Sequence, residues 1–191
     1  MKNWLAGIIA AVTFVVYAAH SIMRWWRFET AGYDLGIFDS VVRAYAHFQI
    51  PIVWLKGENY NIWGDHFHPI LMLLAPLYWI WDDPRMLLLA QAGLIASSVL
   101  VVYRFASRKI SPKLAPWLTI GYAFSWAIQT LINFDFHEIA FAVPLLALAI
   151  DAMDRHSDLV LLLSCFGLLL VREDMGLVVL LFGLIRVWRR P

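Results

Sequence analysis

An all-α, polytopic membrane helix bundle is the fold class that this sequence predicts, from its composition, the length of its apolar runs and the placement of its charges. Hydrophobic residues make up 62% of the 191 residues and charged residues 15%, whereas a soluble domain has about 45–50% and about 25%. The net charge of +1 creates no basic field, so no nucleic-acid partner is expected. The lone Cys165 stands in an apolar run and has no disulfide partner.

Long apolar runs predict about six transmembrane helices within one domain that covers 1–191. A spanning helix needs about 17–25 mostly apolar residues. Runs near this length are 4–23, 86–106, 114–133 and 138–153, followed by a longer one at 157–188. The last run is interrupted by Arg172, Glu173 and Asp174, whose charges would be very costly at mid-bilayer. We therefore predict a hairpin of two short helices there.

A shorter apolar run at 69–81 is predicted to be an interfacial helix that does not cross the membrane. It contains Pro76 and is rich in aromatic residues near its end, namely Tyr78, Trp79 and Trp81. The run is too short to span, and such aromatic residues are enriched at the membrane–water interface.

The charges predict the orientation of the chain. If 69–81 does not cross, nine of the 15 basic residues fall in short loops on the side of the N-terminus: Lys2, Arg104, Arg108, Lys109, Lys113, Arg155, Arg186, Arg189 and Arg190. The positive-inside rule makes that side cytoplasmic. Eleven of the 14 acids then share the outer face.

The segment 28–68 is predicted to be a long outer loop that contains an amphipathic helix over 35–48. Apolar residues recur there at spacings of three and four, and polar residues occupy the opposite stripe. The apolar set is Leu35, Phe38, Val41, Val42, Tyr45 and Phe48, and the polar set is Asp39, Arg43 and His47. A turn-rich return with glycines and asparagines follows at 57–64.

Four polar blocks are expected on the same outer face: YDLGIFD at 33–39, GDHFHP at 64–69, NFDFHE at 133–138 and RED at 172–174. Asp34 and Asp39 are five residues apart, which places them about 140° apart on a continuous helix. Asp34, just before the predicted helix, is predicted to be the inward-facing acid, and it also suits an N-cap. Both roles stay open.

The other blocks combine histidines with acids. Imidazole and carboxylate ligands together suit Mn²⁺, Zn²⁺ or Fe²⁺, which makes Asp65, His66 and His68 candidate metal ligands. The same holds for Asp135 and His137. The alternatives are an interfacial loop whose histidines bond backbone carbonyls, and an ordinary solvated turn. Arg172 either pairs within the charged hairpin tip or holds a phosphate.

The ordered motifs YDLGIFD, GDHFHPILMLLAPLYWIW, NFDFHE and VREDMG resemble a family of prokaryotic predicted membrane proteins, domain of unknown function 2079, over 33–176. That family is similar in plan to the GT-C glycosyltransferases, which use a polyprenyl-phosphate-linked sugar at the outer membrane face. The resemblance implies a GT-C-like fold in the prokaryotic plasma membrane, with two juxtamembrane helices in the first outer loop. Because members are usually longer, it also implies an N-terminal half, with a C-terminal half or a further membrane subunit as partner.

The same resemblance implies roles for particular residues. Asp34 would match the loop acid that serves as the catalytic base, and Asp135 an acid in the next outer loop. Asp39, Glu138 and Arg172 would contact the substrate. The residues that would hold a divalent cation, Mg²⁺ or Mn²⁺, or contact the phosphate are Asp65, His66, His68, Asp135 and His137.

Two other functions stay open. A transporter or lipid flippase would need polar residues deep inside its helices, and the sequence has few: Thr13, Ser97, Ser98, Ser125, Gln129 and Thr130. A non-catalytic membrane subunit would suit the short chain, although it would not require the polar blocks.

Overall fold

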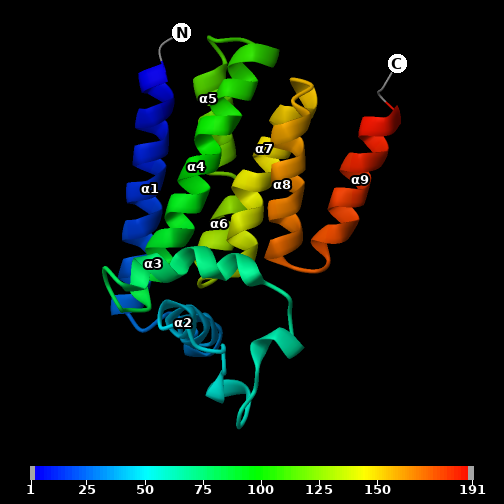
Figure 1. The fold of residues 1–191 in the computed structure, drawn as a ribbon. Coiled ribbons are helices and arrows are strands. Elements are labelled where there is room, and N and C mark those ends of the chain that lie inside the picture. Colours follow the sequence, from blue (N-terminus) through cyan, green and yellow to red (C-terminus); the bar gives the residue numbers. More distant parts are fainter. Residues whose placement is uncertain (1–2, 189–191) are drawn as a thin grey trace.

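The computed structural model describes residues 3–188 as a helix bundle with a second helical layer across one end (Figure 1). The α-helices are α1 (Asn3–Trp26), α2 (Gly32–Ala46), α3 (Ala75–Tyr78), α4 (Arg85–Lys109), α5 (Ala115–Ala123), α6 (Trp126–Asn133), α7 (Ala142–Asp154), α8 (Asp158–Val171) and α9 (Met175–Trp188). Short 3₁₀ helices are η1 (Trp54–Lys56), η2 (Ile62–Gly64), η3 (Pro69–Leu74) and η4 (Glu138–Phe141). Within 3–188 there is no strand, only an isolated bridge between Ile52 and Asn61.

Helix α4 lies at the centre of the bundle and packs against α1, α5 and α7. Its buried face carries Ala92, Ile95 and Val99, small and branched residues that allow close helix packing. Helix α8 packs against α7, and Gly167 permits this approach because an added Cβ would lie 2.9 Å from Leu145 Cδ2. Helix α9 packs chiefly against α8 and contains no buried residue.

Two of the described helices are long and apolar enough to cross a bilayer by length and composition. They are Trp4–Trp26, with 23 residues, and Arg85–Lys109, with 25. Helices α8 and α9 are apolar but have 14 residues each. The all-helical class predicted from the sequence is thus confirmed, while the count of six spanning helices is finer than these lengths establish.

The helix expected over 114–133 is the clearest departure from prediction, because it is broken between α5 and α6. Ser125 has extended backbone angles, with φ −66° and ψ 153°. The Gln129 side-chain amide donates to the Phe124 carbonyl, and the Tyr17 hydroxyl donates to the Ala123 carbonyl, each at 2.6 Å. These bonds satisfy carbonyls that the break releases from the helical pattern. By contrast, 157–188 forms the predicted hairpin, with a turn at 172–174.

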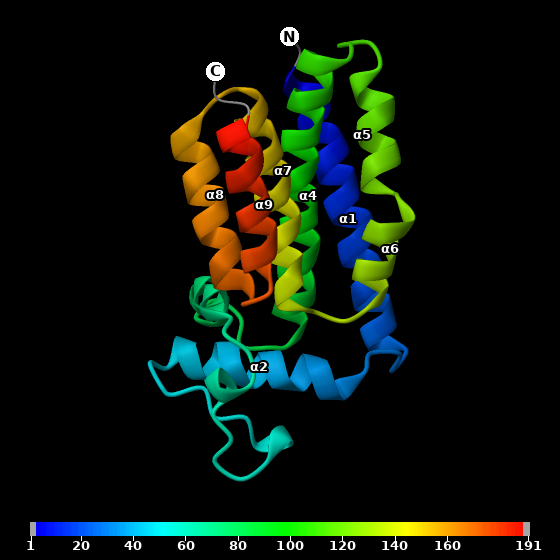
Figure 2. The same cartoon turned by 90° about the vertical axis from the view of Figure 1, so that its right-hand side faces the viewer.

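The second layer consists of α2 and the η3–α3 segment, which lie across the ends of the bundle helices in two perpendicular views (Figures 1 and 2). Helix α2 begins three residues earlier and ends two residues earlier than the predicted 35–48. Phe48 lies beyond it, with a positive φ of 56° and 88% exposure, so it does not extend the apolar stripe. The interfacial segment 69–81 is helical only to Tyr78.

The largest buried cluster joins this layer to the bundle. Helix α2 contributes Leu35, Phe38, Val41, Val42 and Tyr45, which are five of the six predicted apolar positions. They pack with Leu71 and Leu74 of η3, Leu87 of α4, Phe136, and Leu168 of α8. Burial of each large apolar side chain contributes about 1.5–3 kcal/mol of stabilising free energy, which holds the layer against the end of the bundle.

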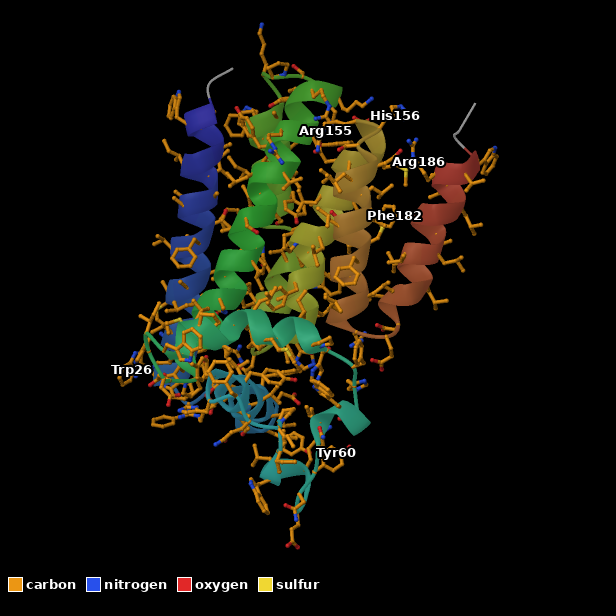
Figure 3. All side chains as sticks on the ribbon, in the orientation of Figure 1. Trp26, Tyr60, Arg155, His156, Phe182 and Arg186 are labelled. Carbon is orange, nitrogen blue, oxygen red and sulfur yellow. The ribbon has the colours of Figure 1, made fainter. Side chains whose placement is uncertain are left out.

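The two ends of the bundle carry different groups. Figure 3 shows Arg155, His156 and Arg186 at the end away from α2, and Tyr60 and Trp26 at the α2 end. The four polar blocks of the sequence belong to the α2 end, because α2, η3, the α6–η4 connection and the α8–α9 turn all meet there (Figure 2).

Candidate functional site

A cavity of about 150 Å³ lies where the four polar blocks meet at the α2 end. Its walls come from the first half of α2, the loop from η1 to η3, the start of η4 and the residue after α8. The lining residues are Tyr33, Asp34, Ile37, Phe38, Lys56, Ile62, Asp65, His66, His68, His137, Glu138 and Arg172. Seven of the nine site residues predicted from the sequence are therefore brought together, and Asp39 and Asp135 are not.

Asp34 is the third residue of α2, so its predicted N-cap role is wrong. The N-cap is Ala31, whose backbone N–H donates to the Asp135 carboxylate instead. Among residues 3–188, the Asp34 side chain has no hydrogen-bond or ion-pair partner. Gly36, two residues further along α2, lies against the loop, because an added Cβ would be 2.8 Å from Leu55 Cδ1. Asp34 is therefore a free carboxylate beside a closely packed loop.

Lys56 is a cavity residue that the sequence motifs did not reveal. Its ammonium group forms an ion pair with Asp65 and lies 5.6 Å from the centre of the Tyr60 ring. The hydrogen bond from Lys56 is the main cause that lowers the pKa of Asp65 below its ordinary value. One signal in the sequence was available, since Lys56 is the only one of four lysines on the predicted acidic face.

Glu173 ties the loop of the cavity to the α8–α9 turn. Its carboxylate lies 2.9 Å from His66 Nδ1 and accepts a second hydrogen bond, of 3.1 Å, from the backbone N–H of Phe67. These contacts, the His66 contact first, lower the pKa of Glu173 to about 2. The predicted pairing within the hairpin tip is thus only partial, since Glu173 bonds to His66 and Phe67 of the loop and not to a residue of the tip.

His68 and Glu138 are the buried polar groups of the cavity, each 2% exposed. Burial lowers the pKa of His68, which favours the neutral imidazole. Its Nδ1 has no hydrogen-bond partner among the described residues. Glu138 lies 3.5 Å from Arg172 Nη1, which is long for a direct hydrogen bond, while Arg172 binds Asp174 through Nε at 2.9 Å and Nη2 at 2.5 Å.

His137 is positioned through its backbone and its ring. Its N–H donates to Gln91 Oε1 at 3.1 Å, and the same Gln91 side chain donates to the carbonyls of Leu131 and Phe134. The imidazole packs edge-on against Phe38 and Phe134, with ring centres 4.9 and 5.2 Å away. A buried amide of α4 therefore fixes the loop that carries the NFDFHE block.

Asp39 and Asp135 lie outside the cavity. Asp39 accepts hydrogen bonds from Arg43 and from the Tyr78 hydroxyl, so it faces the η3–α3 side of α2, as the 140° spacing from Asp34 requires. Asp135 is 4% exposed and lies 3.5 Å from Arg24. Burial raises its pKa, against the opposing effects of the Ala31 N–H and Arg24. It fixes the start of α2.

The predicted metal ligands do not form one ligand set as they stand. Within 3–188, no three His, Cys, Asp or Glu side chains lie together in a way that could hold a metal ion. Asp65 is paired with Lys56, and Asp135 faces Arg24. A divalent ion would have to displace Lys56 to gain a carboxylate ligand from this loop.

A larger apolar groove of about 660 Å³ runs between the end of α2 and the η3–α3 segment. Its walls include Tyr45, Trp63 and Trp79. The Trp63 indole donates to the Tyr45 hydroxyl and the Trp79 indole donates to the Ala46 carbonyl. Both indole N–H groups are thus hydrogen-bonded within the fold, and no acid, histidine or cation is among the residues that line the groove. The charged cavity is therefore the candidate site for chemistry.

A family model described as Predicted membrane protein (DUF2079) matches residues 24–191. The chain belongs to this family. It is accordingly a membrane protein, and all the lining residues of the cavity fall within the matched range. No curated protein and no solved structure matches the chain.

Proposed function

We propose that this DUF2079 protein is a GT-C-like glycosyltransferase, or the N-terminal part of one, that transfers a sugar from a polyprenyl-phosphate donor at the outer membrane face. The observation that carries the proposal is the Asp34 carboxylate, which is free of partners and lines a cavity formed by all four polar blocks. Titratable groups with perturbed pKa values gathered in a cleft are candidates for a functional site, and Asp65, His68 and Arg172 of this cavity are such groups.

The reaction would be a single displacement. An acceptor hydroxyl gives its proton to Asp34 as its oxygen attacks the anomeric carbon of the sugar. The bond between that carbon and the phosphate oxygen breaks, and its electron pair leaves with polyprenyl phosphate. Asp34 suits the role of base because Lys56 and Arg172 are paired with other acids, so the Asp34 carboxylate is available to a substrate.

The proposal places the cavity at headgroup depth on the outer leaflet, with a cytoplasmic N-terminus and six crossings. Helices α1 and α4 are long enough to span, and α2 and η3–α3 lie across the ends of the bundle helices at the cavity end (Figure 2). A donor whose lipid stays in the bilayer would thus present its phosphate and sugar at the level of the cavity.

The divalent cation, Mg²⁺ or Mn²⁺, is a separate part of the proposal. His66, His68 and Asp65 line the cavity and have the right donor atoms, but Asp65 is paired with Lys56. Bound there, a cation would neutralise the leaving phosphate. Transfer should be measured after treatment with EDTA and after addition of Mg²⁺ or Mn²⁺, and unchanged transfer in EDTA would remove the cation from the reaction.

A transporter is the weaker alternative. Three buried polar side chains of the helices are used in internal bonds: Thr13 donates to the Ile9 carbonyl, Ser98 to the Ile95 carbonyl, and Gln91 holds the α6–η4 loop. The hydroxyls of Ser107 and Thr119 are buried without a partner among the described residues, but they carry no charge. The described lengths of α1 and α4 contain no acidic residue that could relay an ion through the bilayer.

Asp34→Asn tests the proposed function. Membranes that contain the protein are supplied with radiolabelled polyprenyl-phosphate mannose, glucose or arabinose, and transfer of label to membrane glycans is measured. Loss of a general base should slow transfer by roughly 100-fold or more, at unchanged protein yield. Glu58→Gln, an exposed loop acid outside the cavity, is the matched control.

Transfer by Asp34→Asn at the rate of the unaltered protein would remove Asp34 from the mechanism. A failure to consume any of the three donors above the level of empty membranes would count against the glycosyltransferase itself.

A further inference from the structure

Three nitrogen-bearing side chains reach the cavity from segments that are far apart in the sequence. Lys56 comes from η1, His68 immediately precedes η3, and Arg172 follows α8. Each has hydrogen-bonding capacity that its neighbours leave unused. Lys56 pairs with Asp65 and Arg172 with Asp174, and Asp65 lines the cavity together with Asp34 and Glu138.

Lys56 is held in place but is not saturated. An ammonium group has three donors, and the one recorded hydrogen bond of Lys56 goes to Asp65. The Tyr60 ring supports the same group through a cation–π contact. Its remaining donors are free to bind an oxygen anion that enters the cavity.

Arg172 is oriented in the same manner. A guanidinium group has five N–H donors in a fixed plane, and Asp174 accepts from Nε and Nη2. Nη1 is directed toward Glu138 at 3.5 Å, beyond a good hydrogen bond. This planar group suits a phosphate, which it can bind through two parallel bonds.

His68 supplies the independent observation that a ligand belongs here. It is 2% exposed and lines the cavity, yet its Nδ1 has no partner among the described residues. Buried polar atoms in folded proteins are nearly always hydrogen-bonded, so an unpaired one calls for a missing partner. The Phe38 ring, 6.0 Å away, packs beside the imidazole.

The size of the cavity limits what that partner can be. Whole drug-sized ligands occupy about 300–1,000 Å³, whereas this cavity measures about 150 Å³. It suits a single headgroup phosphate rather than a lipid chain. A carboxylate would satisfy the same donors less well, since a phosphate monoester offers more oxygens and more charge.

We infer that Lys56, His68 and Arg172 form a binding site for the phosphate of a polyprenyl phosphate, which they hold through the hydrogen-bonding groups that their neighbours leave unused. The identity of the lipid rests on the proposed function, while phosphate binding by these three side chains does not require any transfer reaction. Lys56 is thereby added to the substrate-binding residues, and the orphaned imidazole gains a partner.

Binding to the purified protein in nanodiscs tests this inference without turnover. Fluorescent polyprenyl phosphate, the corresponding polyprenol and inorganic phosphate are titrated separately. The unaltered protein should bind polyprenyl phosphate at least tenfold more tightly than polyprenol. Lys56→Met should lower the affinity for polyprenyl phosphate by roughly tenfold, which corresponds to the loss of one charge-assisted hydrogen bond. The affinity for polyprenol should not change, and Lys56→Arg should restore the affinity for polyprenyl phosphate.

Two further variants keep the result interpretable. Lys56→Met combined with Asp65→Asn removes both charges of the ion pair, so it should fold normally and still lose affinity. Lys109→Met is the matched control, since Lys109 pairs with Asp154 at the other end of the bundle. Unchanged affinity in both Lys56→Met proteins, or equal affinity for polyprenol, would overturn the inference.

Inorganic phosphate that binds as tightly as polyprenyl phosphate would overturn the lipid assignment. Glu58→Gln, the exposed loop acid outside the cavity, should keep full affinity for polyprenyl phosphate. If the transfer assay fails while polyprenyl phosphate still binds, the result counts against the proposed function alone. If the unaltered protein binds polyprenol as tightly as polyprenyl phosphate, the result counts against the phosphate site alone.

Discussion

The two ends of the bundle use the same residue types in opposite ways. At the end away from α2, Asp151 is 1% exposed and pairs with Arg108 and Arg155, each at 2.8 Å, while Asp154 pairs with Arg108 and Lys109. At the α2 end, Asp34 has no partner among the described residues. Buried charge is stable only when it is well paired. We therefore assign a structural role to the paired end and a ligand-binding role to the incompletely paired end.

The proposed topology puts the two ends on opposite sides of the membrane, and its test gives the largest expected effect. With Cys165 replaced (Cys165→Ala), Gly64→Cys and Lys109→Cys are exposed to a membrane-impermeant thiol reagent in intact cells. Gly64→Cys should label fully and Lys109→Cys should not label until the membrane is permeabilised. Reversed labelling would invert the proposed topology.

Asp151→Asn tests the structural reading of the paired end. It leaves Arg108 and Arg155 without their shared carboxylate, and because those arginine side chains are partly exposed we expect a loss of about 1–3 kcal/mol. The midpoint of thermal unfolding should fall by roughly 3–10 °C. Asp34→Asn should leave the midpoint unchanged, and an equal fall in both variants would break the comparison.

Asp135→Asn sharpens the division within the α2 end, because Asp135 was predicted to be a metal ligand and is instead buried against Ala31 and Arg24. The amide oxygen can still accept from the Ala31 N–H, so only the charge facing Arg24 is lost. We expect a loss of about 1 kcal/mol in stability and the same affinity for Mn²⁺ as the unaltered protein, measured by calorimetry. A large loss of Mn²⁺ binding would restore its role as a ligand.

Glu173→Ala should have the smallest effect. The contact with His66 is exposed, so we expect a change in stability within about 1 kcal/mol. Hydrogen exchange at the Phe67 amide should nevertheless accelerate at neutral pH, with Glu58→Ala as the control. Because the pKa of Glu173 is lowered to about 2, the contact should persist above about pH 4.5 and weaken as the pH falls toward 2. Unchanged exchange would mean that Glu173 does not hold the loop.

Periodicity and length predicted most of the helices, because apolar spacing directly reflects which face of a helix is buried. The α2 stripe and the α8–α9 hairpin followed from it. The break at Phe124 and Ser125 did not, since the apolar run continues through it without proline, and the bonds from Tyr17 and Gln129 that stabilise the break come from side chains rather than from a local breaker.

The sequence by itself determined that this is a helical membrane protein whose acids and histidines gather in four blocks, because composition and charge placement respond to the bilayer alone. Only the tertiary structure decided how those groups are used. It sent Asp39 toward Tyr78, used Asp135 to fix the start of α2, and brought Lys56 into the cavity beside Asp65. The reason is physical: whether a charge is paired or free depends on which distant segment packs beside it, and no local pattern records that choice.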